Sequence, residues 1–250
     1  MTAPEELARL RREAVEAAIA SRRSVRGFLP REVPRATVER LLELAARAAS
    51  NTNIQPWRVH VVTGEARRRL CAELVAAHYG QTRPAPEYQY HPTEWRDPFL
   101  ARRRKLGWDL YGLLGIAKGD REAARRQHAR NYEFFGAPVG LFFTVPRDHG
   151  QGSWIDVALF MQGLMIAARA HGLDTCAQAA FIEHHPIVRR HLGIPEGEIL
   201  VCGMALGHAD PDERANRLAS GREPVAAFAR FHDGRERGGS APPGQRVSRT

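Results

Sequence analysis

Arginine and hydroxyl side chains gather in one short stretch near the N-terminus, residues 21–28, which reads Ser-Arg-Arg-Ser-Val-Arg-Gly-Phe. A guanidinium group takes two oxygens of a phosphate in bidentate geometry, and a serine hydroxyl can donate a hydrogen bond to a third. The stretch therefore predicts an anion-binding segment built from Arg22, Arg23, Ser24 and Arg26. Because arginine is abundant throughout the chain, a solvated basic loop is the alternative interpretation of these residues taken alone.

A second polar stretch covers residues 50–57 and reads Ser-Asn-Thr-Asn-Ile-Gln-Pro-Trp. It lies between a helix predicted at residues 37–49 and a strand predicted at residues 58–63. Short polar side chains followed by glutamine and proline are typical of a loop with many directional hydrogen-bonding groups. We expect a ligand to bind there.

Small side chains dominate residues 173–181, which read Leu-Asp-Thr-Cys-Ala-Gln-Ala-Ala-Phe and follow an apolar helix predicted at residues 153–171. Small residues allow a planar ligand to approach the backbone closely, although a tight strand in a crowded core is the alternative. Residues 80–98 hold four prolines and several aromatic side chains. An irregular segment of this length is usually functional, so it predicts a lid over a substrate.

Helical periodicity also predicts helices at residues 4–20, 64–79, 99–114 and 121–135, and strands at residues 139–145 and 198–207. The apolar run at 139–145 is typical of a central strand. Because strands and helices do not alternate regularly, we expect an α+β fold with helices around a mixed sheet. No composition shift divides the chain before its Gly/Pro/Ser/Arg-rich end, so one domain is predicted over residues 1–235 and a disordered tail over 236–250.

The composition excludes several other classes of protein. A net charge of +9 would suit nucleic acid, but 35 of the 37 basic residues are arginines spread along the whole chain, and no nucleic-acid-binding module is visible. Three distant cysteines offer no disulfide framework and favour a reducing cytoplasm. The first residues do not resemble a signal peptide, the apolar segment 154–170 is too short and polar to span a bilayer, and no metal site is expected. The signatures of Rossmann nucleotide sites, phosphate-binding loops and serine hydrolases are missing.

Taken together, residues 22–28, 50–57, 136–138 and 172–181 resemble, in this order and at this spacing, the FMN-dependent nitroreductase family. The resemblance extends over about residues 18–231. It implies a nitroreductase-like fold and an intertwined homodimer with two flavins at the subunit interface. It also implies that the reaction needs no catalytic acid or base, because the flavin supplies the redox chemistry.

The resemblance also assigns residues to the flavin. Those of the first segment, Arg22, Arg23, Ser24 and Arg26, would hold the phosphate and part of the ring. The polar loop would come from the other subunit and contribute Ser50, Asn51, Asn53 and Gln55. Residues along the ring would be Ala177, Gln178 and Ala179, with Ala180 donating a backbone N–H to N5, and Arg222 would close on the phosphate. Many members have proline, glutamate and glycine in place of Ala177, Ala179 and Ala180, so the role expected here is one of the backbone.

The expected activity is that of a cytoplasmic oxidoreductase in which NADH or NADPH reduces bound FMN, and the flavin reduces a nitroaromatic or quinone-like acceptor. The aromatic segment at residues 80–98 keeps open a specialised member of the same fold, such as a reductive dehalogenase or a flavin-consuming enzyme. A non-catalytic FMN-binding protein and a basic nucleic-acid-binding module are further alternatives.

Overall fold

The computed structural model describes residues 2–80 and 86–232. The chain forms two compact units, Met1–Leu218 and Ala219–Thr250. The first unit contains the sheet, and the second contains the short helix α8 (Val225–Phe228). A single domain over residues 1–235 stays a prediction of the sequence, and the tail predicted at 236–250 lies outside the described residues.

Four antiparallel strands form one sheet in the order β1-β2-β4-β3. Their bounds are Arg58–Val62 for β1, Val139–Pro146 for β2, Asp174–Gln178 for β3 and Glu198–Gly207 for β4. The sequence predicted a mixed sheet, but within the described residues the parallel pairing is one isolated bridge between Ser24 and Thr175. No parallel ladder forms because the segment around Ser24 bridges β3 at one residue only, and Phe28, further along this segment, pairs instead with Ala209 and Phe135.

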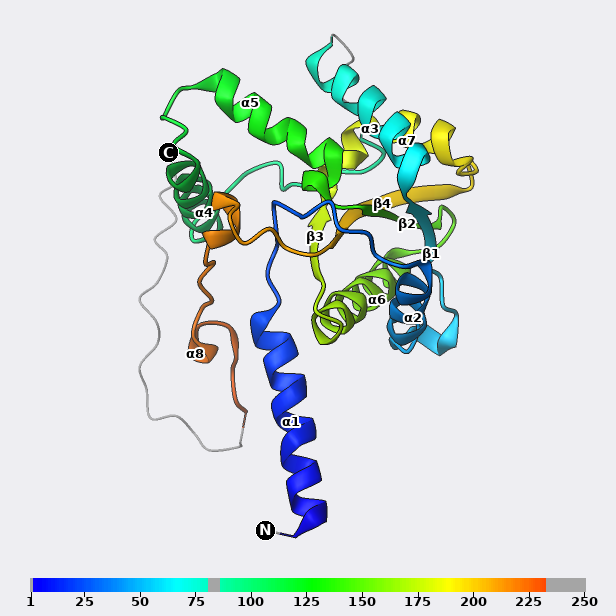
Figure 1. Ribbon diagram of the computed structural model, residues 1–250, viewed down its shortest axis with the longest axis vertical. Coiled ribbons are helices and arrows are strands. Elements are labelled where there is room, and N and C mark those ends of the chain that lie inside the picture. The colour runs from blue at the N-terminus through cyan, green and yellow to red at the C-terminus, as the bar shows by residue number, and fades with distance from the viewer. Residues whose placement is uncertain (1, 81–85, 233–250) are drawn as a thin grey trace, which may run out of the picture. The chain divides into compact units, whose positions relative to one another are not determined.

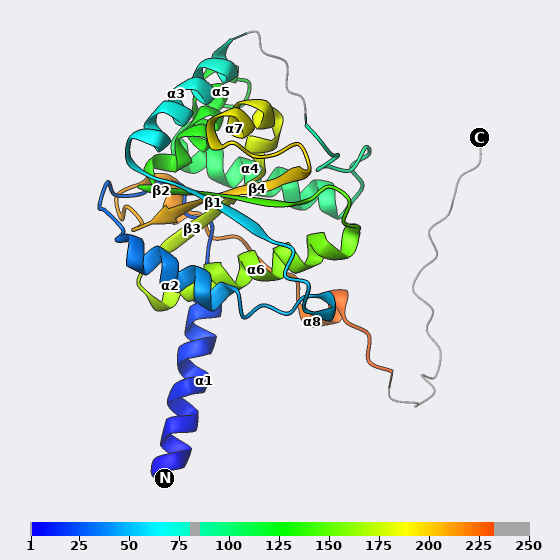
Figure 2. The same cartoon turned by 90° about the vertical axis from the view of Figure 1, so that its right-hand side faces the viewer.

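Helices cover both faces of the sheet, as Figure 2 shows, with α2 and α6 on one side and α3, α5 and α7 on the other. Within the described residues, no helix is long and apolar enough to cross a membrane. The helices are α1 (Ala3–Ser21), α2 (Arg35–Ala45), α3 (Gly64–Tyr79), α4 (Phe99–Leu114), α5 (Arg121–Ala129), α6 (Gln151–Ala170) and α7 (His185–Leu192), and the 3-10 helices are η1 (Asn51–Asn53), η2 (Arg130–Gly136), η3 (Ala179–His184) and η4 (Arg214–Arg217).

The central position predicted for residues 139–145 is confirmed, because β2 lies between β1 and β4 and is buried on both faces. Its side chains alternate: Leu141 and Phe143 pack toward α2 and α6, whereas Phe142 packs toward α3 and α7. Glycine in the sheet makes room for aromatic rings. A Cβ at Gly203 would lie 2.3 Å from Cδ2 of Phe181, so this position cannot carry a side chain without displacing that ring.

The helix predicted at residues 121–135 ends earlier, at Ala129, and continues as η2. Phe134 and Phe135 take positive φ angles of 53° and 54°, a conformation that bulky residues rarely adopt. The carbonyl oxygen of Phe135 accepts a hydrogen bond of 3.1 Å from the backbone N–H of Phe28. Tertiary pairing with the N-terminal segment thus accompanies a turn that helical periodicity could not reveal.

Candidate functional site

The arginine segment, residues 21–28, follows α1 and runs along the end of the sheet (Figure 1). The N–H of Val25 donates to the carbonyl oxygen of Thr175 in β3 at 3.1 Å, and the N–H of Leu29 donates to that of His208 at 2.9 Å. The side chains of Val25 and Phe28 are buried in the core. Backbone bonds and buried side chains therefore fix the part of the segment from Val25 onward, beside Thr175 of β3 and beside His208 after β4.

Asn216 also holds this segment, from 190 residues further along the chain. Its Oδ1 accepts a hydrogen bond of 2.7 Å from the N–H of Arg26, and its Nδ2 donates to the carbonyl oxygens of Gly27 at 2.8 Å and Asp210 at 2.9 Å. Glu213 fills the space beside Gly27, where a Cβ would lie 2.1 Å from its Cγ. Asn216 and Glu213 therefore determine the backbone path that presents the arginines.

The guanidinium groups of the segment suit a phosphate. Nearby arginines are neutralised, since Arg130 pairs with Glu213 at 2.7 Å and Arg169 with Asp174 at 2.5 Å. Within residues 2–80 and 86–232, by contrast, no carboxylate forms an ion pair with Arg22, Arg23 or Arg26. Three uncompensated cations with a serine hydroxyl fit the charge and hydrogen-bonding needs of a phosphate monoester.

The field of these arginines reaches the adjacent strand. Burial raises the pKa of the Cys176 thiol to about 11, while the charges of Arg26 and Arg22 and a hydrogen bond with Ser24 act in the opposite direction. The first site segment and β3 are therefore in direct contact, as the bridge between Ser24 and Thr175 also shows.

The end of β3 presents backbone and methyl groups. Ala177 is exposed, and Ala179 and Ala180 are half-buried. The side chain of Gln178 points inward, because the residue is 3% exposed and its Nε2 donates to the carbonyl oxygen of Asn131 at 2.8 Å. Contact of Gln178 with a ligand would therefore involve its backbone. The buried ring of Phe181 anchors the segment against the core.

The polar loop at residues 50–57 has a strained backbone. Thr52, Asn53 and Gln55 take positive φ angles of 44°, 60° and 48°. Such conformations cost energy and concentrate at functional sites. The loop is held internally by the bond from the N–H of Gln55 to Ser50 Oγ at 3.1 Å, and the N–H of Asn51 donates to Asp156 Oδ1 at 3.2 Å.

The structure does not bring the polar loop and the arginine segment together within one chain. In Figures 1 and 2, η1, which follows α2, lies apart from the segment that follows α1. Arg222 belongs to the second unit, where its Nη1 donates to the carbonyl oxygens of Ser220 and Gly221 and to Ser220 Oγ. Its predicted role at the phosphate stays a prediction.

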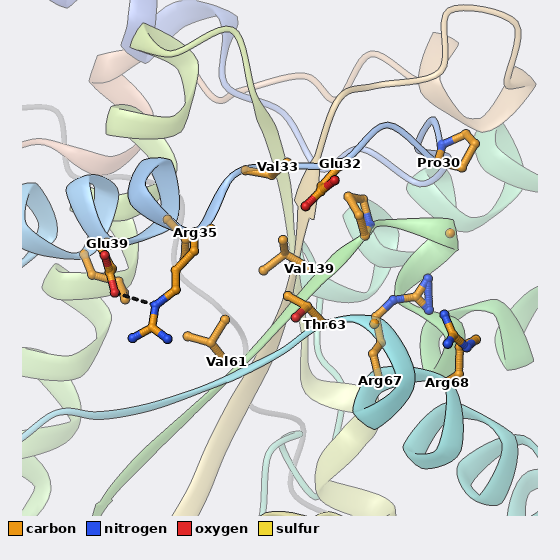
Figure 3. A pocket seen from close by; sticks show the side chains of 15 residues that line it. Pro30, Glu32, Val33, Arg35, Glu39, Val61, Thr63, Arg67, Arg68 and Val139 are labelled. Atoms are coloured by element: carbon orange, nitrogen blue, oxygen red, sulfur yellow. Dashed lines mark hydrogen bonds and ion pairs between the residues drawn. The ribbon is translucent and has the colours of Figure 1, made fainter.

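A cavity of about 800 Å³ lies between α2, β1 and α3, and none of the predicted site residues lines it. Figure 3 shows Arg35 pointing toward Glu39, with which it forms an ion pair of 2.7 Å, and Arg67 beside Arg68 at the other end. The predicted site therefore lies outside this cavity. It is defined by fixed backbone and uncompensated charge.

A sequence profile of the nitroreductase family matches residues 19–208, which include the arginine segment, the polar loop and the end of β3. The chain belongs to the nitroreductase family. This confirms the family and the nitroreductase-like fold that the resemblance implies, although the sheet is antiparallel and not mixed.

Relatives of this chain include 4-nitrobenzoate reductase of Nocardioides sp. (strain LMS-CY), which is 42% identical over 92% of this chain and 96% of the relative. Chloronitrobenzene nitroreductase of Comamonas testosteroni is 37% identical over 85% and 94%. The crystal structure of the FMN and NADPH-dependent nitroreductase NfnB of Sphigopyxis sp. strain HMH is 38% identical, covers 87% of this chain and 98% of that chain, and has a TM-score of 0.84.

Sequence reasoning missed the residues that support the site of this nitroreductase. Asn216 and Glu213 lie in a polar stretch after β4 that carries no periodicity and no motif. A weak signal was Gly27, because a glycine between Arg26 and Phe28 indicates a close neighbour. Only the structure shows that this neighbour of Gly27 is Glu213.

Proposed function

We propose that this chain is an FMN-dependent oxidoreductase that uses NADPH or NADH to reduce nitroaromatic or quinone-like acceptors. The observation that carries the proposal is the set of three arginines without a carboxylate partner among the described residues, on a segment that Val25 holds to Thr175 of β3 and that Asn216 holds through the N–H of Arg26. The names of the relatives support the choice of cofactors and acceptor.

In this proposal Arg22, Arg23 and Arg26 bind the FMN phosphate, and the end of β3 lies along the ring. The small side chains of Ala177, Ala179 and Ala180 keep the backbone accessible, so that an N–H can donate to the ring. When bound, FMN supplies the two-electron chemistry that connects oxidation of the nicotinamide to reduction of the acceptor. The chain contributes binding, orientation and electrostatic stabilisation of the anionic cofactor.

We further propose a homodimer located in the cytoplasm, where the three buried, unpaired cysteines would stay reduced. All 19 residues of α1 escape burial within the chain, and Leu7, Leu10, Val15 and Ile19 are each about half exposed. Isolated helices are marginal in water, so this apolar face needs a partner. Ile155 and Leu159 add exposed apolar surface on α6, which α1 contacts.

The test of the cofactor is the absorption spectrum of the purified protein and its anaerobic reduction by NADPH. We expect noncovalent FMN that bleaches on reduction and regains its colour when a nitroaromatic is added. Bound FMN that NADPH cannot bleach would indicate a non-catalytic flavin-binding protein, and a colourless protein that does not take up FMN would refute the assignment.

The arginine assignment predicts that Arg22→Ala or Arg26→Ala weakens FMN binding by about 1.5 to 3 kcal/mol, the usual contribution of a hydrogen bond to a charged group. Arg121→Ala, at an exposed arginine on α5, is the matched control and should leave FMN affinity unchanged. Equal affinities of all three variants and the wild type, measured by fluorescence titration, would leave the segment as a solvated loop.

Shared sites are tested with mixed dimers that carry Arg26→Ala on one chain and Asn53→Ala on the other. If the polar loop of each chain completes the partner's site, both defects fall in one site and the other is wild type. We expect FMN stoichiometry and activity near half of wild type, whereas each homodimeric variant is damaged at both sites. Two singly damaged sites in the mixed dimer, with no rescue, would instead indicate that the loop serves its own chain's flavin.

A further inference from the structure

A second cavity, of about 430 Å³, adjoins the end of β3 on the side of the aromatic segment. One wall is formed by Ala179 and Ala180, the residues proposed to lie at the flavin ring. A further part of the lining comes from the aromatic segment, and His128, Asn131, Ile182 and Glu183 complete it. Its volume lies in the range of pockets for small molecules.

The wall made by the aromatic segment is anchored to the core by Glu87 and Tyr88. The Glu87 side chain is 8% exposed and forms ion pairs with Arg147 at 2.5 Å and Arg189 at 3.3 Å. Tyr88 donates its hydroxyl to the carbonyl oxygen of Val201 at 2.5 Å. Glu87 and Tyr88 of the predicted lid are therefore held to the core, and Tyr88 and Tyr90 line the cavity.

Charge in this cavity comes from Glu183. The chain has 37 lysines and arginines, yet none of them lines the cavity within the described residues. Burial lowers the pKa of His128, which keeps this imidazole uncharged at pH 8. The carboxylate of Glu183 is held in place by buried Tyr132, whose hydroxyl donates to Glu183 Oε2 at 3.2 Å.

We propose that this cavity binds the electron acceptor, that it takes an uncharged aromatic ring, and that Glu183 selects against acceptors with a carboxylate substituent. The inference rests on the proposed function. Tyr88 and Tyr90 offer aromatic surface to a single ring, and the small side chains of Ala179 and Ala180 would let that ring approach the proposed position of the flavin. A carboxylate on the acceptor would lie beside Glu183, and no lysine or arginine among the described residues lines the cavity to compensate it.

The test compares 4-nitrobenzamide with 4-nitrobenzoate, which are similar in shape and differ in charge, on the FMN-loaded enzyme at pH 8 and constant ionic strength. We expect wild type to favour the amide in kcat/KM. Glu183→Gln keeps an acceptor for Tyr132 and should lower the amide-to-acid ratio roughly tenfold. Glu133→Gln, at an exposed glutamate that does not line this cavity, is the matched control and should leave the ratio unchanged.

A second variant tests the cavity independently of charge. Tyr90→Ala removes an aromatic ring from the wall and should raise KM for both acceptors about fivefold, without slowing flavin reduction by NADPH. An unchanged ratio in Glu183→Gln, or an effect on KM for NADPH alone, would overturn the acceptor assignment while leaving the proposed function intact. Failure of wild type to bind FMN or to oxidise NADPH would instead refute the proposed function itself.

Discussion

Gly203→Ala tests whether the packing beneath β3 and β4 positions the site. Gly203 pairs with Gln178 across the sheet, and an added Cβ would lie 2.3 Å from Cδ2 and 2.8 Å from Cε2 of Phe181. Phe181 cannot move freely, because it is fully buried with its ring centroid 4.7 Å from that of Phe134 and 4.9 Å from that of Phe142. The new methyl group must therefore displace a ring that follows directly on Ala179 and Ala180.

Overpacking of this kind costs about 1 to 3 kcal/mol in the free energy of unfolding. For a domain of this size, that corresponds to a fall in Tm of roughly 2 to 12 °C. Because Phe181 anchors the end of β3, FMN affinity should fall as well. Calorimetry measures the first effect, and titration of the apoprotein with FMN measures the second.

Gly107→Ala in α4 is the matched control, since its added Cβ meets no atom within 4 Å. Alanine in a helix is favoured over glycine by about 0.5 to 1 kcal/mol, so this variant should match or exceed wild type in stability. If Gly203→Ala keeps the Tm and FMN affinity of wild type, the aromatic cluster is not closely packed and the reasoning fails.

Three further predictions concern buried ionisable groups. Burial would raise the pKa of Glu87, but the hydrogen bonds from Arg147 and the N–H of Leu200, with nearby positive charges, lower it below 4.5. The contribution of Glu87 to the free energy of unfolding is therefore present at neutral pH and is lost as pH falls below about 4.5. Glu87→Gln should lower the free energy of unfolding in urea at pH 7 by about 2 kcal/mol and should reduce the loss of stability in acid. An unchanged urea midpoint would contradict the role of Glu87 as an anchor. Burial lowers the pKa of His184 from 6.5, so as pH falls the unfolded chain takes up a proton before the folded chain does, and stability decreases below about pH 6.5. His184→Gln should lose less free energy of unfolding than wild type between pH 7.5 and 5.5. Identical slopes of stability against pH in the two proteins would refute this prediction. Burial also raises the pKa of the Cys71 thiol, and it raises those of Cys176 and Cys202 to about 11 and about 12. Iodoacetamide at pH 8 should therefore leave the folded protein without alkylated cysteines, which mass spectrometry measures. Rapid alkylation would show that the thiols are accessible.

The sequence alone determined those features that depend on neighbouring residues. The helices at 64–79 and 99–114 and the strand at 198–207 have the predicted bounds, because periodicity and turn residues act locally. The chemistry of Arg22, Ser24 and Arg26 was also visible, since closely spaced donors need no tertiary information to suggest an anion. Together with the order of the motifs, these residues identified the family.

Only the tertiary structure decided which distant groups meet. Asn216 bonds to Arg26 across 190 residues, and Glu87 pairs with Arg189 across 102, although neither carboxylate nor amide belongs to a motif. The sheet is antiparallel, and Gln178 points inward, because pairing register and core packing fix the direction of each strand and side chain. The type of a side chain determines which interactions it can form. The path of the chain determines which partners it meets, and that path depends on packing of the whole domain.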